Sequence, residues 1–226
     1  MIILVGGEKG GTGKSMVSCN LAAYLAHKGR DVMLVDADPQ ATSTKWVNRR
    51  NKQHPDLPKI NSTQKTGDVF ETVRDLAGRY DEVIIDAGGR DSEELRTALV
   101  TSHKVITPLF PAQDNIETME RMIGLVKQAK ALNRSLEAFV LMNRVSTNPQ
   151  VRTVFDAVKF LEEQQDVFTV LGRNKINDYK AFQDANAEGL SVIEATHGKA
   201  KAQIQMLCDL LYAPVKTKEE EAAVHG

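Results

Sequence analysis

The sequence contains few of the residues that mark specialised classes of protein. Only two of its 226 residues are cysteines, Cys19 and Cys208, and neither belongs to a Cys-x-x-Cys pair or a histidine cluster. This pattern excludes a disulfide scaffold and a zinc or iron–sulfur centre, and it predicts two small buried thiols in a reducing compartment. The formal net charge is only −1. The chain as a whole therefore has no attractive field for nucleic acid, and any such contact needs a local basic patch.

Long apolar runs are missing as well. The N-terminal segment MIILVGGEKGG has no basic region and only about five apolar residues before its glycines, which excludes a signal peptide and a membrane span. We therefore expect a cytoplasmic protein. Apolar residues make up 42% and charged residues 26% of the chain, a composition that is typical of a globular protein with a substantial core.

Short apolar runs alternate along the chain with longer segments of helical period. Such alternation is typical of parallel βαβ units, and continuously apolar runs indicate strands that are covered on both faces. The predicted fold class is therefore α/β, with a single doubly wound, mostly parallel sheet flanked by helices. The predicted strands are Ile2–Val5, Val32–Val35, Val83–Ile85, Lys104–Thr107, Phe139–Met142 and Val167–Leu171.

Two helices are predicted from apolar residues at helical spacing. The first covers Lys14–Lys28 and ends before Gly29, a natural left-handed C-cap. The second covers Asp114–Ala131.

The polar segment between the second and third main strands interrupts this alternation. It extends from Trp46 to Thr66, and we predict a surface loop or insertion there, with Lys59–Asn61 as a short extra strand. No domain boundary is predicted in it. Residues 1–212 are expected to form one domain, and residues 213–226 a flexible charged tail.

A loop rich in glycine and lysine follows the first predicted strand. The segment GGEKGGTGKS, residues 6–15, leads directly into the helix that begins at Lys14. Glycines let successive backbone N–H groups point inward, and the helix N-terminus adds partial positive charge, as a phosphate site requires. Lys14 would reach the β and γ phosphates, and the Ser15 hydroxyl would ligate Mg²⁺. The residues predicted to bind nucleotide here are Lys9, Gly10, Gly11, Thr12, Gly13, Lys14, Ser15 and Met16.

Carboxylates follow two of the predicted strands. Asp36 and Asp38 lie in the segment VDADPQ, and Asp86 closes the apolar run EVIID. Ligands of open α/β sheets gather at the carboxyl edge of the strands. Asp86 therefore has the place of a Walker B aspartate, which would anchor the waters of Mg²⁺.

The phosphate loop differs from the ordinary Walker A motif. Glu8 stands where that motif has its first glycine, and a second lysine, Lys9, completes the deviant form K-G-G-x-G-K-[ST]. In this respect the sequence resembles the deviant Walker ATPases, which include the partition ATPases (ParA), the septum-site ATPase MinD and the nitrogenase iron protein. The resemblance covers roughly residues 1–212 and implies a P-loop NTPase that uses ATP and Mg²⁺.

The resemblance also implies roles for individual residues. Lys9 would reach across a nucleotide-sandwich homodimer to the phosphates of the other subunit, as a lysine counterpart of the arginine finger. Asp38 would orient or deprotonate the attacking water, and Asp36 would hold the Mg²⁺ shell through a water. Lys9, Lys14 and Asp38 are thus the predicted catalytic residues. Asn143 occupies the place where relatives bind the adenine edge, with a strand-terminating turn as the alternative.

The segment after Asp86 departs from the pattern of the family. Ala87-Gly88-Gly89-Arg90 replaces the Asp-x-Pro-Pro that is common in relatives. Two glycines still suit a mobile switch II whose N–H meets the γ-phosphate.

The family resemblance further implies non-specific DNA binding by the ATP-bound dimer, because two subunits double a weak basic surface. No aromatic residues lie among the candidate lysines, so only phosphate contacts are expected. Each of these lysines could also be an ordinary solvated one. The candidates are Lys175, Lys180, Lys199 and Lys201.

The predicted function is that of a small partition ATPase, cytoplasmic and associated with the nucleoid. Its release from DNA would follow ATP hydrolysis stimulated by a ParB-like or small centromere-binding partner. A MinD-like membrane role is not expected, because Glu219–Val224 lacks an amphipathic apolar face. The alternatives are a positioning ATPase for protein cargo, such as chemoreceptor clusters or carboxysomes, and an ATP-dependent amide ligase or carboxylase.

Overall fold

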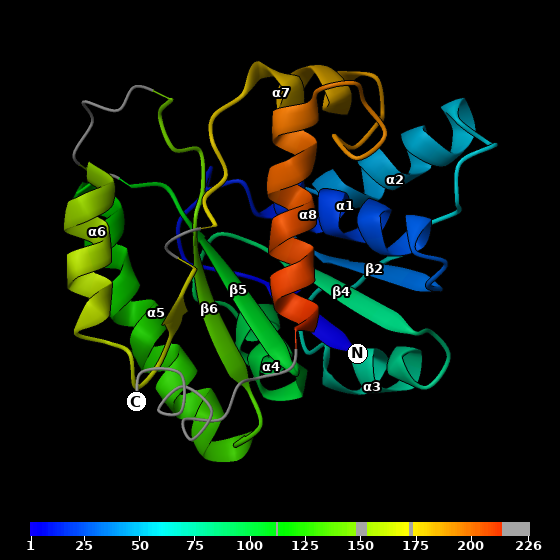
Figure 1. The fold of residues 1–226 in the computed structure, drawn as a ribbon. Helices are drawn as coiled ribbons and strands as arrows, with labels where there is room; N and C mark the ends of the chain where they lie inside the picture. The colour runs from blue at the N-terminus through cyan, green and yellow to red at the C-terminus, as the bar shows by residue number, and fades with distance from the viewer. Residues whose placement is uncertain (112, 148–152, 172–173, 214–226) are drawn as a thin grey trace, which may run out of the picture.

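One parallel sheet forms the centre of the molecule (Figure 1). The computed structural model describes residues 1–111, 113–147, 153–171 and 174–213. Within these residues the strand order is β3-β2-β4-β1-β5-β6-β7, and every pair of neighbours is parallel. The strands are β1 Ile2–Val5, β2 Val32–Ala37, β3 Asn61–Gln64, β4 Glu82–Ala87, β5 Lys104–Leu109, β6 Glu137–Met142 and β7 Thr169–Val170.

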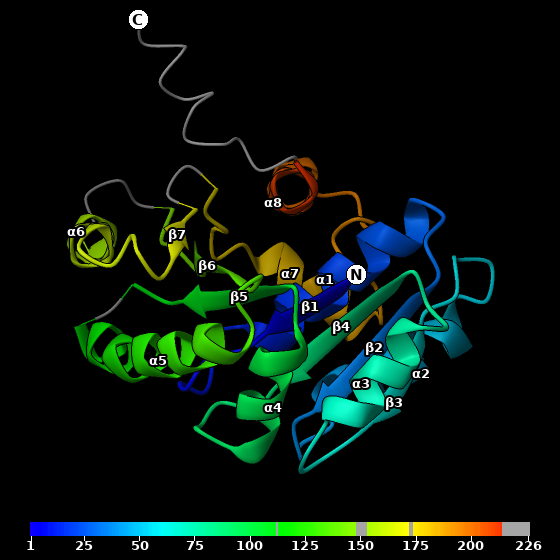
Figure 2. The same cartoon turned by 90° about the horizontal axis from the view of Figure 1, so that it is seen from below.

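Helices cover both faces of this sheet (Figure 2). Helices α1, α2, α7 and α8 pack on one face, α3, α4 and α5 pack on the other, and α6 packs beside α5 and β7. The predicted doubly wound α/β fold is therefore confirmed. The helices are α1 Lys14–His27, α2 Thr42–Gln53, α3 Phe70–Ala77, α4 Glu93–Thr101, α5 Gln113–Leu132, α6 Thr153–Glu162, α7 Lys180–Ala187 and α8 Gly198–Tyr212.

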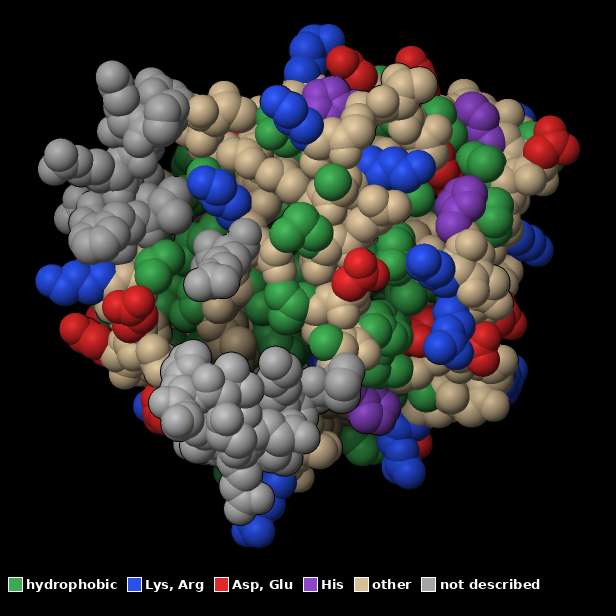
Figure 3. Space-filling view, in the orientation of Figure 1, with side chains coloured by type: hydrophobic (Ala, Val, Ile, Leu, Met, Phe, Trp, Pro, Cys, Tyr) green, Lys and Arg blue, Asp and Glu red, His purple; other side chains and the backbone are tan. Residues whose placement is uncertain are grey.

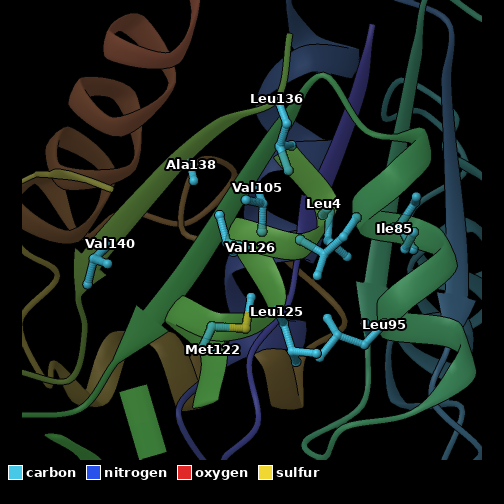
Figure 4. Close-up of a cluster of buried hydrophobic side chains, with 14 of the residues drawn as sticks. Leu4, Ile85, Leu95, Val105, Met122, Leu125, Val126, Leu136, Ala138 and Val140 are labelled. Carbon is cyan, nitrogen blue, oxygen red and sulfur yellow. The ribbon is translucent and has the colours of Figure 1, made fainter. Parts of the chain in front are cut away.

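The strands contribute to two separate hydrophobic cores because their side chains alternate between the two faces of the sheet. In β1, Leu4 belongs to the core under α4 and α5, whereas Ile3 belongs to the core under α1 and α8. Figure 4 shows the first of these cores, in which Leu4 and Val105 from the sheet lie close to Met122 and Val126 of α5. This double burial explains why the strand sequences are continuously apolar.

The two predicted helices are present. Helix α1 ends at His27, and Gly29 adopts the left-handed conformation with φ +77°. Helix α5 contains the second predicted segment. Both cysteines are buried and free, as expected. No helix in the described part of the chain is long and apolar enough to cross a membrane, and residues 214–226, most of the predicted tail, lie outside that part.

The prediction of a loop or insertion from Trp46 to Thr66 is wrong. Helix α2 covers its first part and β3 its end, and β3 is also displaced from the predicted Lys59–Asn61. The sequence of α2 has no clear helical pattern of apolar residues, because few of its residues, chiefly Trp46, Val47 and Arg50, reach the core. It also lacks a polar N-cap, since Ala41 occupies that position. Strand β3 is polar because it forms an edge of the sheet.

The last predicted strand, Val167–Leu171, is also shorter than expected. Strand β7 covers only Thr169–Val170 and pairs with β6 alone. Val167 and Leu171 are buried outside it, so their apolar character reflects packing rather than strand pairing.

Candidate nucleotide site

The phosphate loop lies between β1 and α1, at the carboxyl edge of the sheet. Its start is fixed by the Gly6 N–H, which donates to Ile106 O at 3.0 Å. Gly11 and Gly13 adopt φ values of +77° and +91°, a region that favours glycine. A Cβ at Gly13 would lie 2.3 Å from the Asn143 side-chain nitrogen. The tight curl of the loop therefore depends on glycine at position 13.

Lys14 is held inside this loop. Its side chain is buried, and Nζ donates to Lys9 O at 2.7 Å. Burial lowers the pKa of Lys14, while the negative charges of Asp86 and Asp38 oppose this shift. An ammonium group in this position is available to an anion that enters the loop, because only a backbone carbonyl competes for it.

Two carboxylates lie side by side beneath the loop. Asp36 on β2 and Asp86 on β4 are in register, and both are buried. Burial raises the pKa of Asp86 to about 6, and the charge of Asp36 adds to this increase, against the opposing effect of the nearby hydroxyl groups of Ser15, Ser43 and Ser18. Asp86 Oδ1 accepts from Ser18 Oγ at 3.2 Å. Oδ2 has no hydrogen-bond partner within the described residues.

This donor set suits a hydrated magnesium ion. Mg²⁺ prefers oxygen ligands and is commonly held by one or two carboxylates together with several waters. Asp86 offers an unpartnered buried oxygen next to Ser15, the first-turn hydroxyl of α1. A cluster of three or more His, Cys, Asp or Glu side chains, which would suit other metals, does not occur among the described residues.

Asp36 also determines how the chain leaves β2. Its Oδ2 accepts from the Thr44 N–H at 2.8 Å, and its Oδ1 accepts from the Asp38 N–H at 3.2 Å. The strand-end carboxylate thus caps the N-terminus of α2, a role that Ala41 cannot fill. Asp38 in turn accepts from the Gln40 N–H at 2.9 Å. The loop after β2 is therefore held in a defined turn beside the phosphate loop.

The loop after β4 touches both of these loops. A Cβ at Gly88 would lie 3.5 Å from Asp38 Oδ2, an ordinary contact distance. A Cβ at Gly89 would lie 2.8 Å from Gly10 N and 3.0 Å from the carbonyl carbon of Lys9. This close approach of two backbones is the structural reason for glycine at position 89, and it brings the predicted switch II against the phosphate loop.

A cavity of about 330 Å³ extends from the loop along the first turn of α1 toward α2 and α7. Its volume falls in the range of pockets that hold small ligands. Asn143 is fully buried beside it, and its side-chain NH₂ donates to Thr12 O at 2.6 Å. The structure therefore places Asn143 against the phosphate loop, and its contact with a base stays a prediction. The cavity lining includes Met16, Trp46, Arg144, Asp178, Tyr179 and Phe182.

Most of this lining was not found from the sequence. Asp178, Tyr179 and Phe182 are far from the loop along the chain, and no spacing rule connects them to it. For Arg144 the only signal is its place directly after Asn143, at the carboxyl end of β6.

The four candidate DNA-binding lysines lie in two segments, residues 174–180 and the start of α8, and Lys201 borders a hollow that Tyr24 and His27 also line. The Asn177 and Gln203 side chains form a hydrogen bond, and the Tyr179 and His197 rings lie 5.0 Å apart, so residues 174–180 contact the start of α8. Figure 3 shows Lys and Arg side chains spread over this face of the molecule among neutral and acidic ones. Lys180 forms an ion pair with Asp184 at 2.7 Å. The others, Lys175, Lys199 and Lys201, have no ion pair to a described residue.

Residues 3–192 match the family model described as the CobQ/CobB/MinD/ParA nucleotide binding domain. The chain belongs to this family. A relative from Gloeobacter kilaueensis, named maintenance of carboxysome distribution protein A, is 30% identical over 199 residues, covering 85% of this chain and 84% of the relative. Protein ParA of Rhizobium radiobacter is 28% identical, covering 67% of each chain. The solved structure of apo McdA from Cyanothece superposes with a TM-score of 0.76 at 13% identity, covering 93% of this chain and 98% of the other.

The contact between Gly89 and the phosphate loop of this ParA/MinD-family protein can be tested by substitution. We expect Gly89→Ala to weaken the binding of a fluorescent ATP analogue at least about tenfold, which corresponds to 1.4 kcal/mol. The reason is that the added methyl group must displace the backbone at Lys9 and Gly10. Gly88→Ala is the matched control, because its methyl group would make only an ordinary contact with Asp38. Equal affinities for the two variants would contradict the assigned contact.

Proposed function

We propose that the protein is a partition ATPase that binds ATP with Mg²⁺, forms a homodimer, binds DNA without sequence preference and leaves it after hydrolysis. The observation that supports this most strongly is the register pairing of Asp36 with Asp86 beneath a loop with two lysines, Lys9 and Lys14. One lysine can bind the phosphates of its own subunit. The second has no such task there and is available to the phosphates of a second subunit.

Each step has a residue suited to it. The N–H groups of residues 10–16 would bind the phosphates, and Lys14 Nζ would exchange Lys9 O for the β and γ oxygens. Mg²⁺ would be held by Ser15, Asp36 and Asp86 and would neutralise charge on these oxygens. Asp38 would orient the attacking water. The cavity beside Met16 would take the nucleoside, and Asn143, which lies against Gly13 of the phosphate loop, would contact the base.

The remaining steps involve partners. The lysines near the start of α8 would contact DNA phosphates, and two subunits would bind far more tightly than one. A ParB-like or small centromere-binding protein would stimulate hydrolysis, and the protein would be cytoplasmic and associated with the nucleoid. Hydrolysis would then act as a timer for release.

The decisive experiment compares the wild type with Asp38→Ala. The wild type should bind a generic DNA duplex in ATP much more tightly than in ADP, and light scattering should show a dimer only in ATP. Asp38→Ala should retain the ATP dimer and its DNA binding while turnover falls by about 10²-fold or more, the range for loss of a general base. Equal DNA binding in ATP and ADP would refute the proposed function. Normal turnover in Asp38→Ala would remove Asp38 from its assigned role.

A second candidate function is the positioning of a protein cargo on the nucleoid. It is favoured by the 30% identity to a relative named for carboxysome distribution. The chemistry at the nucleotide would be the same. A deletion strain distinguishes the two, because a partition ATPase is needed to retain a replicon, whereas a positioning ATPase is needed to distribute the cargo. An amide ligase or carboxylase would instead show ATP turnover that depends on a metabolite rather than on DNA.

A further inference from the structure

Arg144 connects the phosphate loop to the loop that contains Asp178, which lies far from it along the chain. Its Nη1 donates to Gly11 O at 3.2 Å, and its Nε donates to Asp178 Oδ1 at 3.3 Å. The guanidinium group also lies 5.8 Å from the centre of the Phe110 ring. The backbone of Arg144 has φ +53°, a left-handed conformation that is strained for a residue with a side chain. These contacts therefore hold the residue in a conformation that it would otherwise leave.

The loop that contains Asp178 is joined to the same strand end. The Val145 N–H donates to Ile176 O, and the Asp178 N–H donates to Val145 O, both at 2.9 Å. Residues 176–178 therefore extend β6 as a short parallel bridge directly after Arg144. A movement of Arg144 would be transmitted to this loop, because the two segments share backbone hydrogen bonds as well as an ion pair.

The far side of this loop holds the N-terminal half of α8. Gln203 Oε1 accepts from the Asn177 N–H at 3.0 Å, and Gln203 Nε2 donates to Asn177 Oδ1 at 2.5 Å. One side chain thus satisfies both the backbone and the side chain of Asn177. Tyr179 adds a ring contact with His197, the N-cap of α8. Lys199 and Lys201 belong to the first turn of this helix.

The other end of the connection is the hydrogen bond from Lys14 to Lys9, which a bound nucleotide would break. Lys14 Nζ bonds to Lys9 O, and the phosphates of a bound nucleotide would compete for this ammonium group. The segment from Lys9 to Gly11 would then lose one of the two hydrogen bonds to Lys9 O, the other being that from Thr12 Oγ1 at 3.4 Å. A Cβ at either Gly10 or Gly11 would meet nothing within 4 Å, although the backbone of Gly10 lies against Gly89. Gly11 O, the acceptor of Arg144, lies in this segment and would move with it.

We infer that Arg144 is a positioning residue that couples occupancy of the phosphate loop to the orientation of α8 through Asp178, Asn177 and Gln203. The coupling rests on the proposed function, because it gives ATP control over the placement of the lysines at the start of α8. ATP then acts on DNA affinity within each subunit, in addition to its effect through dimerisation. The contact that would differ between the empty and the occupied phosphate loop is the hydrogen bond from Arg144 to Gly11 O.

The test uses Gln203, because it lies outside the nucleotide cavity. In Gln203→Ala we expect ATP-dependent dimerisation and basal ATP turnover like those of the wild type, measured by light scattering and phosphate release. The increase in DNA affinity that ATP produces should fall at least about fivefold, the lower end of ordinary coupling between sites. Gln205→Ala is the matched control, since Gln205 is on the same helix, is similarly half-buried and forms no side-chain hydrogen bond with a described residue. It should retain the full increase.

The outcomes separate this inference from the function on which it rests. If the wild type itself shows no ATP-dependent DNA binding, the proposed function fails. If the wild type shows it and Gln203→Ala retains it in full, the coupling is refuted. Hydrogen exchange on the wild type gives a measurement without any substitution. Peptides that cover residues 174–180 and 197–204 should change protection together when a non-hydrolysable ATP analogue binds, and unchanged peptides would overturn the inference.

Discussion

Replacing Lys9 with alanine is expected to lower ATP turnover by about 10³-fold and to leave the protein monomeric in ATP. The magnitude follows from the loss of a cation that is supplied in trans to a phosphoryl group, which is worth about 10³–10⁵ in kcat. Lys9 is suited to this role because it lies at the rim of the loop, where its side chain is partly exposed and forms no ion pair within the described residues. Its carbonyl, not its ammonium group, contacts Lys14. Light scattering and phosphate release measure the two effects.

A mixing experiment shows from which subunit the cation comes. A Lys14→Ala chain is expected to bind nucleotide poorly, but it still carries Lys9, so adding it to Lys9→Ala should restore turnover at the site of the latter. No recovery on mixing would contradict action across the dimer. Lys52→Ala, an exposed lysine at the end of α2, is the control for loss of a positive charge and should behave like the wild type.

Replacing Glu194 with glutamine is expected to lower the free energy of unfolding by about 3–5 kcal/mol, the usual cost of leaving a buried charge without its partner. Arg50 of α2 is fully buried, and its Nε lies 3.1 Å and 3.2 Å from the two oxygens of Glu194. Its Nη1 donates to Pro58 O at 2.9 Å. The carboxylate also accepts from the Ser191 N–H at 3.0 Å. Chemical denaturation followed by circular dichroism measures the loss.

The stability that the Arg50–Glu194 pair contributes should decrease as the pH falls. Burial raises the pKa of Glu194, but hydrogen bonds from Arg50 and from the Ser191 N–H outweigh burial and hold it below its ordinary value. The pair therefore contributes its full stability above the unfolded pKa of about 4.3, and the contribution is lost as the pH falls through the lower pKa of the folded state. In Glu194→Gln this acid-dependent loss should be smaller than in the wild type.

An exposed pair provides the comparison. Asp75 of α3 and Arg79, two residues after the end of that helix, form an ion pair with both side chains more than half exposed. Asp75→Asn should therefore cost no more than about 0.5 kcal/mol. Similar losses in the free energy of unfolding for the two substitutions would contradict a large stabilising contribution from the buried Arg50–Glu194 pair.

The sequence was sufficient for those parts of the molecule whose chemistry is local. The phosphate loop needs glycines at fixed positions and a helix directly after them, and Gly13 with its φ of +91° meets both requirements. The strands of the central sheet are buried on both faces, so apolar runs alone indicate them. The positions of Asp36 and Asp86 at the ends of two such runs then follow from the parallel arrangement.

Other parts depend on contacts between residues that are far apart in the chain. Helix α2 has a polar sequence because it is held by Asp36 at its start and by the Arg50–Glu194 pair, and neither contact leaves a periodic pattern. The cavity wall at Tyr179 and Phe182 reaches the phosphate loop only through the packing of α7 beside α1 and α2. Asn143 donates a hydrogen bond to Thr12 O, a contact between residues far apart in the chain that the sequence does not indicate, and its predicted contact with adenine stays a prediction.

The place of β1 in the sheet has a consequence for synthesis of the protein. β1 is translated before its neighbours β4 and β5, and Ile3 pairs with Ile84 and with Lys104. Both edges of this apolar strand stay without a partner until those segments have been translated. The phosphate loop is thus translated before the strands that complete its surroundings, and until they follow, the nascent chain exposes an apolar segment of the kind that chaperones bind.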